Sequence, residues 1–191
     1  MKLAQRILRR SVPATIAAAT LLVAGSAAAA SYFYSFSNMS AGTSFSFGDS
    51  LTPAGSTVEF KKFQWWNGTW FAGGGATVVF SNNAGGLANE LNLDNINMRV
   101  IPDTPAISAG YKYADFGGNV NLGVNGDLRN VAQLIVLDGD VVGGCDVSVT
   151  ETPIVGGVRG TVDITCDAPN EIDMFGVGGQ EFFVDGVHFA D

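Results

Sequence analysis

The chain contains 191 residues, of which 47% are hydrophobic and 15% are charged, and its formal net charge at pH 7 is −8. This length suits a single domain with one hydrophobic core. The excess of acidic residues repels phosphate backbones, so the composition argues against a protein that binds nucleic acid.

The first thirty residues have the pattern of a bacterial secretory signal peptide. The basic residues of this segment are Lys2, Arg6, Arg9 and Arg10. An apolar segment (14–24) and a run of small residues (25–30) follow, and the run ends in an A-x-A cleavage site. The apolar segment is too short to span a bilayer, and the helix-disfavouring Pro13 precedes it. We expect cleavage before Ser31, secretion to the medium, cell surface or periplasm, and no membrane insertion afterwards.

Residues 31–191 are predicted to form one all-β domain. Cleavage would leave six basic and eighteen acidic residues, a net charge of −12, which suits an extracellular protein and also one that collects divalent cations. Short runs of alternating β-branched and aromatic residues are separated by Gly, Asn, Asp and Pro, which is typical of antiparallel sheets. We predict a two-sheet antiparallel β-sandwich of the jelly-roll type. Besides the segments discussed below, we expect strands at 31–36, 43–47, 77–81, 119–124, 133–137, 171–175 and 181–189.

A β-hairpin is predicted over residues 59–71. Asn67-Gly68 favours a two-residue type I′ turn, which would place Trp65 opposite Trp70 and both rings on one face.

The three tryptophans of this hairpin are candidate ligand-binding residues. They are Trp65, Trp66 and Trp70. Flat aromatic rings offer apolar surfaces on which sugar faces pack, so the hairpin is a candidate platform for a glycan. The alternative is that at least one set of rings faces the core.

The apolar alternation changes phase between residues 91 and 100. Leu91 and Leu93 follow one phase, whereas Ile96, Met98 and Val100 follow the other. One additional residue would produce this change, so we expect a β-bulge near Asp94-Asn95.

Cys145 and Cys166 flank a second predicted hairpin. The alternating residues of its two strands pair as Val149 with Val162 and Val147 with Ile164. This register brings the two cysteines opposite each other, which in an exported protein predicts a disulfide. Two free thiols or a metal site are the alternatives, but zinc requires about four ligands and His188 is the sole histidine.

Signals for catalysis are sparse. The sequence contains neither a G-x-S-x-G nucleophile elbow nor an H-x-x-x-H metal motif. A pair of carboxylates such as Asp138 and Asp140 could serve a glycoside hydrolase, but with Gly139 between them they more simply form a turn. We therefore expect a protein that is not an enzyme.

The closing segment, 182–189, contains a carboxylate among apolar residues. Asp185 alternates with Phe183, Val187 and Phe189, so we expect it to point with them. A buried carboxylate requires a partner, and backbone amides and a calcium ion are equal alternatives.

This segment resembles the terminal strand of jelly-roll carbohydrate-binding modules, which commonly end in a hydrophobic-Asp-(Asp/Asn/Gly)-Val pattern. In several such families the aspartate helps to hold a structural calcium ion, and the resemblance would give that role to Asp185.

These observations lead to a ranked expectation of function. The first hypothesis is a secreted, non-catalytic domain that recognises a polysaccharide or another extracellular surface ligand. The second is a structural or adhesive surface protein that self-associates through sheet edges. A small carboxylate-dependent glycoside hydrolase comes last.

Overall fold

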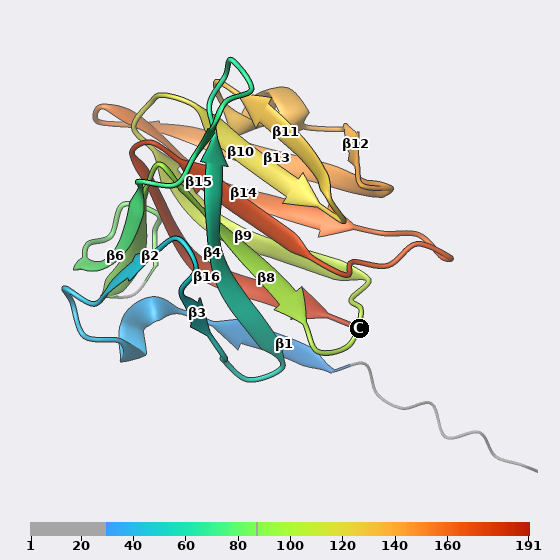
Figure 1. Ribbon diagram of the computed structural model, residues 1–191. Helices are drawn as coiled ribbons and strands as arrows, with labels where there is room; N and C mark the ends of the chain where they lie inside the picture. The colour runs from blue at the N-terminus through green and yellow to red at the C-terminus, as the bar shows by residue number, and fades with distance from the viewer. Residues whose placement is uncertain (1–29, 87) are drawn as a thin grey trace, which may run out of the picture.

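The computed structural model describes residues 30–86 and 88–191, so the predicted signal peptide at 1–30 lies outside it except for Ala30. Two antiparallel sheets pack face to face, which confirms the predicted all-β sandwich (Figure 1). Within these residues, no helix is long and apolar enough to cross a membrane.

The first sheet contains nine strands. In spatial order they are β12 (Val141–Val142), β13 (Cys145–Ile154), β14 (Gly157–Thr165), β9 (Ser108–Asp115), β16 (Phe182–Ala190), β7 (Asn89–Asp94), β6 (Gly75–Phe80) and β2 (Ser44–Ser46), with β1 (Ser31–Tyr34) beside the second half of β16.

The second sheet contains seven strands and lies toward the viewer in Figure 1. In spatial order they are β11 (Asp127–Val131), β10 (Val120–Val124), β15 (Phe175–Gly179), β8 (Ile96–Pro102), β4 (Ser56–Gln64) and β3 (Ser50–Leu51), with β5 (Trp70–Phe71) beside the end of β4. Two short 3₁₀ helices, η1 (Phe36–Asn38) and η2 (Leu134–Leu137), complete the regular structure.

The strand pairing is that of a jelly roll. Strand β7 pairs with β16, β8 with β15, β9 with β14 and β10 with β11. These pairs are nested along the chain: the two strands of each pair lie between the two strands of the previous pair, as in one long hairpin that curls up. Rolling distributes the eight strands into the sheets β7-β16-β9-β14 and β8-β15-β10-β11, as the sequence predicts.

The change of phase between residues 91 and 100 is a corner between the sheets, so the predicted bulge is wrong. Strand β7 ends at Asp94 in the first sheet, and β8 begins at Ile96 in the second. Asn95 joins them with a φ of +54°, a conformation that asparagine tolerates. Both phases face one core, because the chain approaches that core from opposite sides.

Large apolar side chains fill the space between the sheets. The Phe45 ring on β2 stacks on the Phe60 ring on β4, with centroids 4.5 Å apart, and so joins the two sheets. Tyr113 and Phe182 stack within the first sheet at 5.4 Å. Each such side chain contributes about 1.5 to 3 kcal/mol by leaving water.

Two predicted strands differ in the structure. Residues 134–137 form η2, because Leu134 and Leu137 are both buried at the three-residue spacing of a 3₁₀ helix. Most of 171–175 is irregular, and β15 begins only at Phe175. The Asp173 N–H is bound by the side chain of Asn125 at 2.8 Å rather than by a neighbouring strand.

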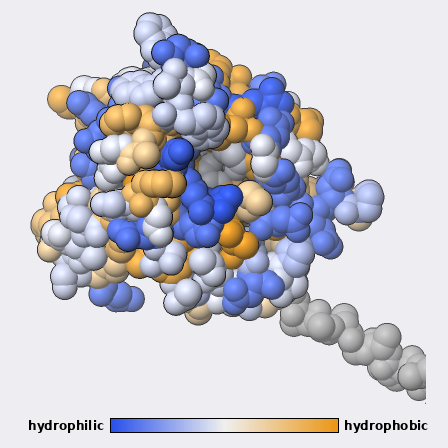
Figure 2. Space-filling view, in the orientation of Figure 1, coloured by the Kyte–Doolittle hydropathy of each residue, from blue (hydrophilic) through white to orange (hydrophobic). Residues whose placement is uncertain are grey.

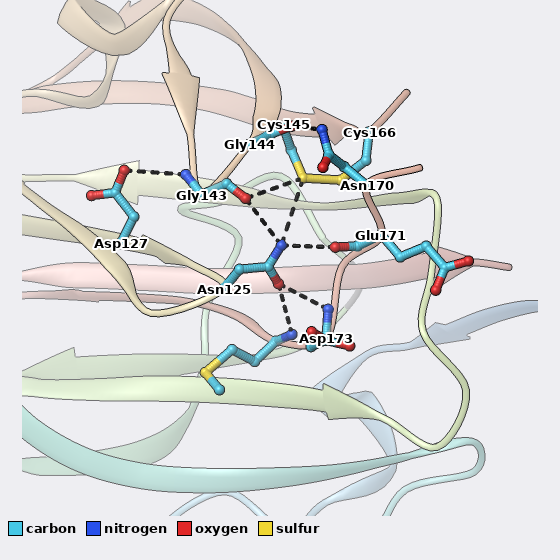
Figure 3. Close-up of a disulfide and its surroundings, with 10 residues drawn as sticks. Asn125, Asp127, Gly143, Gly144, Cys145, Cys166, Asn170, Glu171 and Asp173 are labelled. Carbon is cyan, nitrogen blue, oxygen red and sulfur yellow. Dashed lines mark hydrogen bonds between the residues drawn. A yellow bond between two sulfur atoms is a disulfide. The ribbon is translucent and has the colours of Figure 1, made fainter. Parts of the chain in front are cut away.

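The cysteine hairpin has the predicted register. Val149 pairs with Val162 and Val147 with Ile164. Cys145 and Cys166 form a disulfide whose Cα atoms are 4.3 Å apart (Figure 3). A loop of this length contributes about 3 kcal/mol in the chain-entropy model. The strands continue to the pair Ile154 and Gly157, so the connection is much shorter than the predicted 151–160.

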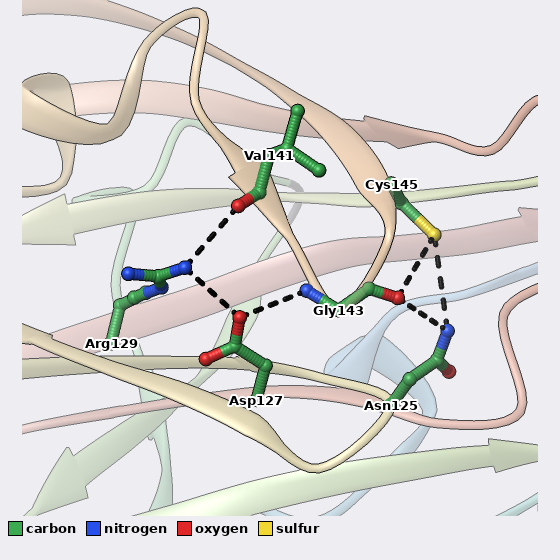
Figure 4. A network of polar contacts seen from close by, with 6 residues as sticks. All are labelled: Asn125, Asp127, Arg129, Val141, Gly143 and Cys145. Carbon is green, nitrogen blue, oxygen red and sulfur yellow. Dashed lines mark hydrogen bonds and ion pairs between the residues drawn. The ribbon is translucent and has the colours of Figure 1, made fainter.

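Asn125 connects three loops beside the disulfide (Figures 3 and 4). Its φ is +50°. Its amide nitrogen donates to the Gly143 carbonyl at 3.1 Å and to the Glu171 carbonyl at 2.7 Å, and its amide oxygen accepts from the Asp173 N–H. Nearby, the Asp127 carboxylate accepts from the Gly143 N–H at 3.2 Å. One side chain therefore fixes the β10–β11 turn against the two segments that adjoin the disulfide.

Two substitutions separate the contributions of Asn125. Asn125→Gly keeps access to positive φ but loses the side-chain hydrogen bonds, and we expect it to lower the free energy of unfolding by about 2 to 3 kcal/mol. Asn125→Ala should cost about 1 kcal/mol more, because alanine disfavours positive φ. Urea unfolding measures both values.

Asn170→Ala is the matched control. Asn170 donates one exposed hydrogen bond, at 3.1 Å to the Gly144 carbonyl, and its loss should cost about 1 kcal/mol or less. Equal effects at Asn125 and Asn170 would contradict the connecting role.

Candidate functional site

The predicted hairpin at 59–71 forms with a different turn. The Trp65 N–H donates to the Thr69 carbonyl at 2.9 Å, and the Gly68 N–H donates to the Trp65 carbonyl at 2.8 Å. A type I′ turn needs positive φ at both central residues, but of Asn67 and Gly68 only Gly68 has it, at +83°. The Asn67 side chain instead accepts from the Thr69 N–H at 3.0 Å. The result is a three-residue loop with a glycine bulge.

This turn shifts the register by one residue. Gln64 lies opposite Trp70, and Phe63 lies opposite Phe71. Trp65 and Trp70 therefore do not share a face, and that prediction is wrong.

The three tryptophans have different environments. Trp65 is half-buried and packs edge-on against Phe63 and Phe71, with centroid distances of 5.7 and 5.9 Å. Trp66 and Trp70 are 85% and 53% exposed. One ring thus belongs to a small aromatic cluster, while two rings are presented to solvent.

Asparagine side chains hold the base of the hairpin against the outer face of the second sheet. The amide of Asn97 donates to the Lys62 carbonyl at 2.7 Å. The amides of Asn119 and Asn130 both donate to the Gln64 carbonyl, at 2.9 and 2.8 Å. These bonds satisfy carbonyls at and just beyond Lys62, the last residue of β4 that pairs with β8.

Gly178 in β15 makes room for Asn97. Asn97 on β8, Gly178 on β15 and Asn121 on β10 are direct neighbours across the sheet. A Cβ atom at Gly178 would overlap Oδ1 of Asn97. The Gly-x-Gly alternation of β15 therefore reflects a requirement for space on this outer face.

A groove with a volume of about 180 Å³ lies beside the hairpin on this face. Apolar side chains line part of it, namely Trp70, Leu128 and Met174. Basic side chains line another part, namely Lys61, Lys62 and Arg99. Figure 2 looks onto this side of the molecule and shows hydrophilic residues gathered near its centre among apolar patches.

Glu59 contacts two of these basic side chains. Oε2 of Glu59 accepts from Nε of Arg99 at 2.9 Å and lies 3.2 Å from Nζ of Lys61. The hydrogen bond from Arg99 lowers the pKa of the Glu59 carboxyl. Glu59 is thus ionised at neutral pH and fixes two cations at the edge of the groove.

A second, open hollow lies on the other side of the hairpin. It is lined by Trp65, Trp66, Gly118, Asn119, Asn130, Val131, Ala132 and Gln180. The hairpin therefore presents tryptophan rings to two neighbouring depressions, and amide groups border the second one.

Asp185 is buried as predicted, but on the outer face of the first sheet rather than toward the core. A bulge separates Asp185 from His188, with Gly186 at a φ of +58°. Asp185 therefore pairs with the exposed Lys112 on the outer face, rather than sharing the inward phase of Val187.

Backbone groups cover the Asp185 carboxylate. The Phe36 N–H donates to its Oδ1 at 3.4 Å. A Cβ at Gly86 would overlap Oδ2, so the Gly86 backbone lies directly against that oxygen. The described contacts thus match the backbone-capping alternative.

Glu90 is a second buried carboxylate in this region, and sequence reasoning missed it. It accepts from the Ser81 hydroxyl, from the Asn83 N–H at 2.9 Å and from the Gly86 N–H at 3.3 Å. It alternates with Leu91 and Leu93, which face the core, and so lies on the outer face of β7, where the strand pattern gave no signal of burial. Across residues 30–86 and 88–191, no group of three or more His, Cys, Asp and Glu side chains is arranged for a metal ion.

Asp138 and Asp140 form the turn that the sequence favours. The Asp138 carboxylate accepts from the Val149 N–H at 2.8 Å, and Gly139 has a φ of +81°. Asp138 therefore caps backbone on β13.

Asp115 is a carboxyl whose pKa is raised. It is 3% exposed, and this burial raises its pKa. The Gly117 N–H, which donates to Oδ1 at 2.8 Å, opposes the shift, and the negative charge of Glu151 adds to it. Glu151 in turn accepts from the Tyr113 hydroxyl at 2.6 Å.

The raised pKa gives a pH-dependent expectation for Asp115→Asn. The folded state holds the proton more tightly than the unfolded chain, so wild-type stability decreases as the pH rises from the ordinary Asp pKa through the folded value. Asparagine keeps the acceptor for Gly117 without a charge. The variant should therefore gain stability relative to wild type on going from acidic to neutral pH, as measured by urea unfolding. An identical difference at both pH values would contradict this.

No family model, no curated protein and no solved structure matches this chain.

Proposed function

We propose that this protein is a secreted, non-catalytic domain that binds a polysaccharide through the hairpin at 59–71 and the two depressions beside it. The exposure of Trp66 and Trp70 is the observation that carries the proposal. Large aromatic rings normally lie in the core, and surface clusters of them are typical of recognition sites. Ring faces for apolar C–H groups and amides for hydroxyl groups are the chemistry that sugars require.

Secretion is part of the proposal. The disulfide suits an oxidising compartment, and the segment before Ser31 has the composition of an export signal.

Self-association is the alternative, and it draws on exposed side chains elsewhere. Phe33 and Phe80 are 70% and 80% exposed, which favours an adhesive contact. Against it, three of the four strands at the ends of the two sheet orders are short: β12 and β3 have two residues each and β2 has three, whereas β11 has five. Short edges discourage edge-to-edge pairing.

Binding to insoluble polysaccharide tests the proposal. Trp66→Ala and Trp70→Ala should each weaken retention about tenfold or more, as for an aromatic hot spot, and change stability by less than about 0.5 kcal/mol. Trp65→Ala should instead cost about 1 to 3 kcal/mol of stability, because it removes packing on Phe63 and Phe71.

The outcomes separate the hypotheses. If wild type is retained by no polysaccharide but sediments as an oligomer, the adhesive role takes first place. If soluble sugars are released from the polysaccharide, the protein is a hydrolase.

Calcium at Asp185 stays a prediction, with backbone capping as its competitor. The Phe36 N–H donates to one carboxylate oxygen and the Gly86 backbone lies against the other, so backbone capping alone predicts equal melting temperatures in millimolar calcium and in chelator. A higher melting temperature in calcium that is lost in Asp185→Ala would establish the ion.

A further inference from the structure

The basic residues are distributed unevenly over the domain. Residues 31–191 contain six of them against eighteen acidic residues. Three of the six, Lys61, Lys62 and Arg99, line the groove beside Trp70, whereas Asp127 is the sole acidic residue that lines it in the described part of the chain. Half of the positive charge therefore surrounds one small groove on a strongly acidic molecule.

These charges are not cancelled locally. Oε2 of Glu59 is shared between Arg99 and Lys61, so one negative charge faces two positive ones. Asp127 is paired with Arg129 at 3.0 Å. Lys62 forms no ion pair within residues 30–86 and 88–191, and its Nζ lies 5.5 Å from the Phe47 ring centroid.

The groove combines this charge with surfaces that suit a sugar. Trp70, which is 53% exposed, offers a ring for C–H groups, and Leu128 and Met174 extend the apolar part. Its volume of about 180 Å³ is below the ~300 Å³ at which drug-sized pockets begin. It therefore suits one ring of a longer chain, with that ring's substituent directed toward the lysines.

We infer that the groove beside Trp70 binds an anionic polysaccharide, whose carboxylate or sulfate groups are bound by Lys62 and Lys61 while a sugar ring packs on Trp70. This inference rests on the proposed function and narrows its ligand class. The acidic remainder of the surface repels an anionic chain, so the chain would be directed to this face.

Three soluble polymers with the same backbone test the inference: dextran, carboxymethyl-dextran and dextran sulfate. We expect the charged polymers to bind more tightly than dextran, with an affinity that decreases as salt is added. Tight binding of only one of them identifies the anion as carboxylate or sulfate. Polyglutamate, a polyanion without sugar, should bind weakly.

Two lysine variants distinguish an effect of the position of a positive charge from an effect of the net charge of the protein. Lys62→Gln removes a cation at the groove, whereas Lys112→Gln removes one from the outer face of the first sheet. We expect Lys62→Gln to weaken binding of the charged polymer about tenfold, as for one charged hydrogen bond, and Lys112→Gln to leave it nearly unchanged.

A groove-filling variant provides a test that leaves charge unaltered. A Cβ at Gly123 would lie 3.5 Å from Leu128, its nearest neighbour, which is ordinary contact. This room for a Cβ and the preference of strands for β-branched residues favour a folded Gly123→Val, which should lose affinity for the charged polymer.

Four results would overturn the inference. These are equal affinity for dextran and its charged derivatives, equal effects of the two lysine variants, unchanged affinity in a folded Gly123→Val, and polyglutamate binding as tight as that of the charged dextrans. If dextran binds equally well and Trp70→Ala weakens it, the proposed function survives without the charge preference. If no polysaccharide binds, neutral or charged, both fail.

Discussion

The candidate site depends on hydrogen bonds from asparagine side chains to two backbone carbonyls. Strand β4 pairs with β8 only as far as Lys62. At this point the Lys62 and Gln64 carbonyls accept from side-chain amides on β8, on the residue before β10 and on β11. An unpaired carbonyl here would cost about 1 to 3 kcal/mol where it is shielded from water, so these amides make it favourable for the hairpin to cross the sheet.

This arrangement explains how tryptophan rings can be exposed without weakening the fold. The hairpin has its own aromatic cluster, in which Phe63 is fully buried and Trp65 packs against it. Trp66 and Trp70 are not part of this aromatic cluster. Trp65 thus contributes to the stability of this short segment, whereas Trp66 and Trp70 are presented to solvent.

Sequence reasoning recovered what depends on local alternation. The sandwich and the register of the cysteine hairpin both followed from the period of two along a strand. The reasoning failed where a side chain from a distant strand intervened. The hairpin turn was misassigned because the Asn67 side chain binds the Thr69 N–H. The bulge at residue 186 reversed the expected direction of Asp185, and no local pattern announced it.

The asparagines that border the site were also missed, for a related reason. Each of them donates to a carbonyl more than thirty residues away in sequence. Asn119 and Asn121 alternate with Gly123 along one segment, and Gly176 alternates with Gly178 along another, but the meaning of these patterns required the order of the strands in the sheet.

The nested pairing of the jelly roll also has a consequence for the order of folding. The innermost pair, β10 and β11, is joined by a two-residue turn and needs almost no loop closure, whereas β7 and β16 come from distant parts of the chain. Pairs of greater sequence separation carry a higher entropic cost of closure and form more slowly. We expect strand pairing to begin at the turn at Asn125-Gly126 and to end with the pair β7 and β16. The face that supports the tryptophan hairpin is formed by β8, β10, β11 and β15, and in this order it is assembled before the outermost pair, β7 and β16, closes the first sheet.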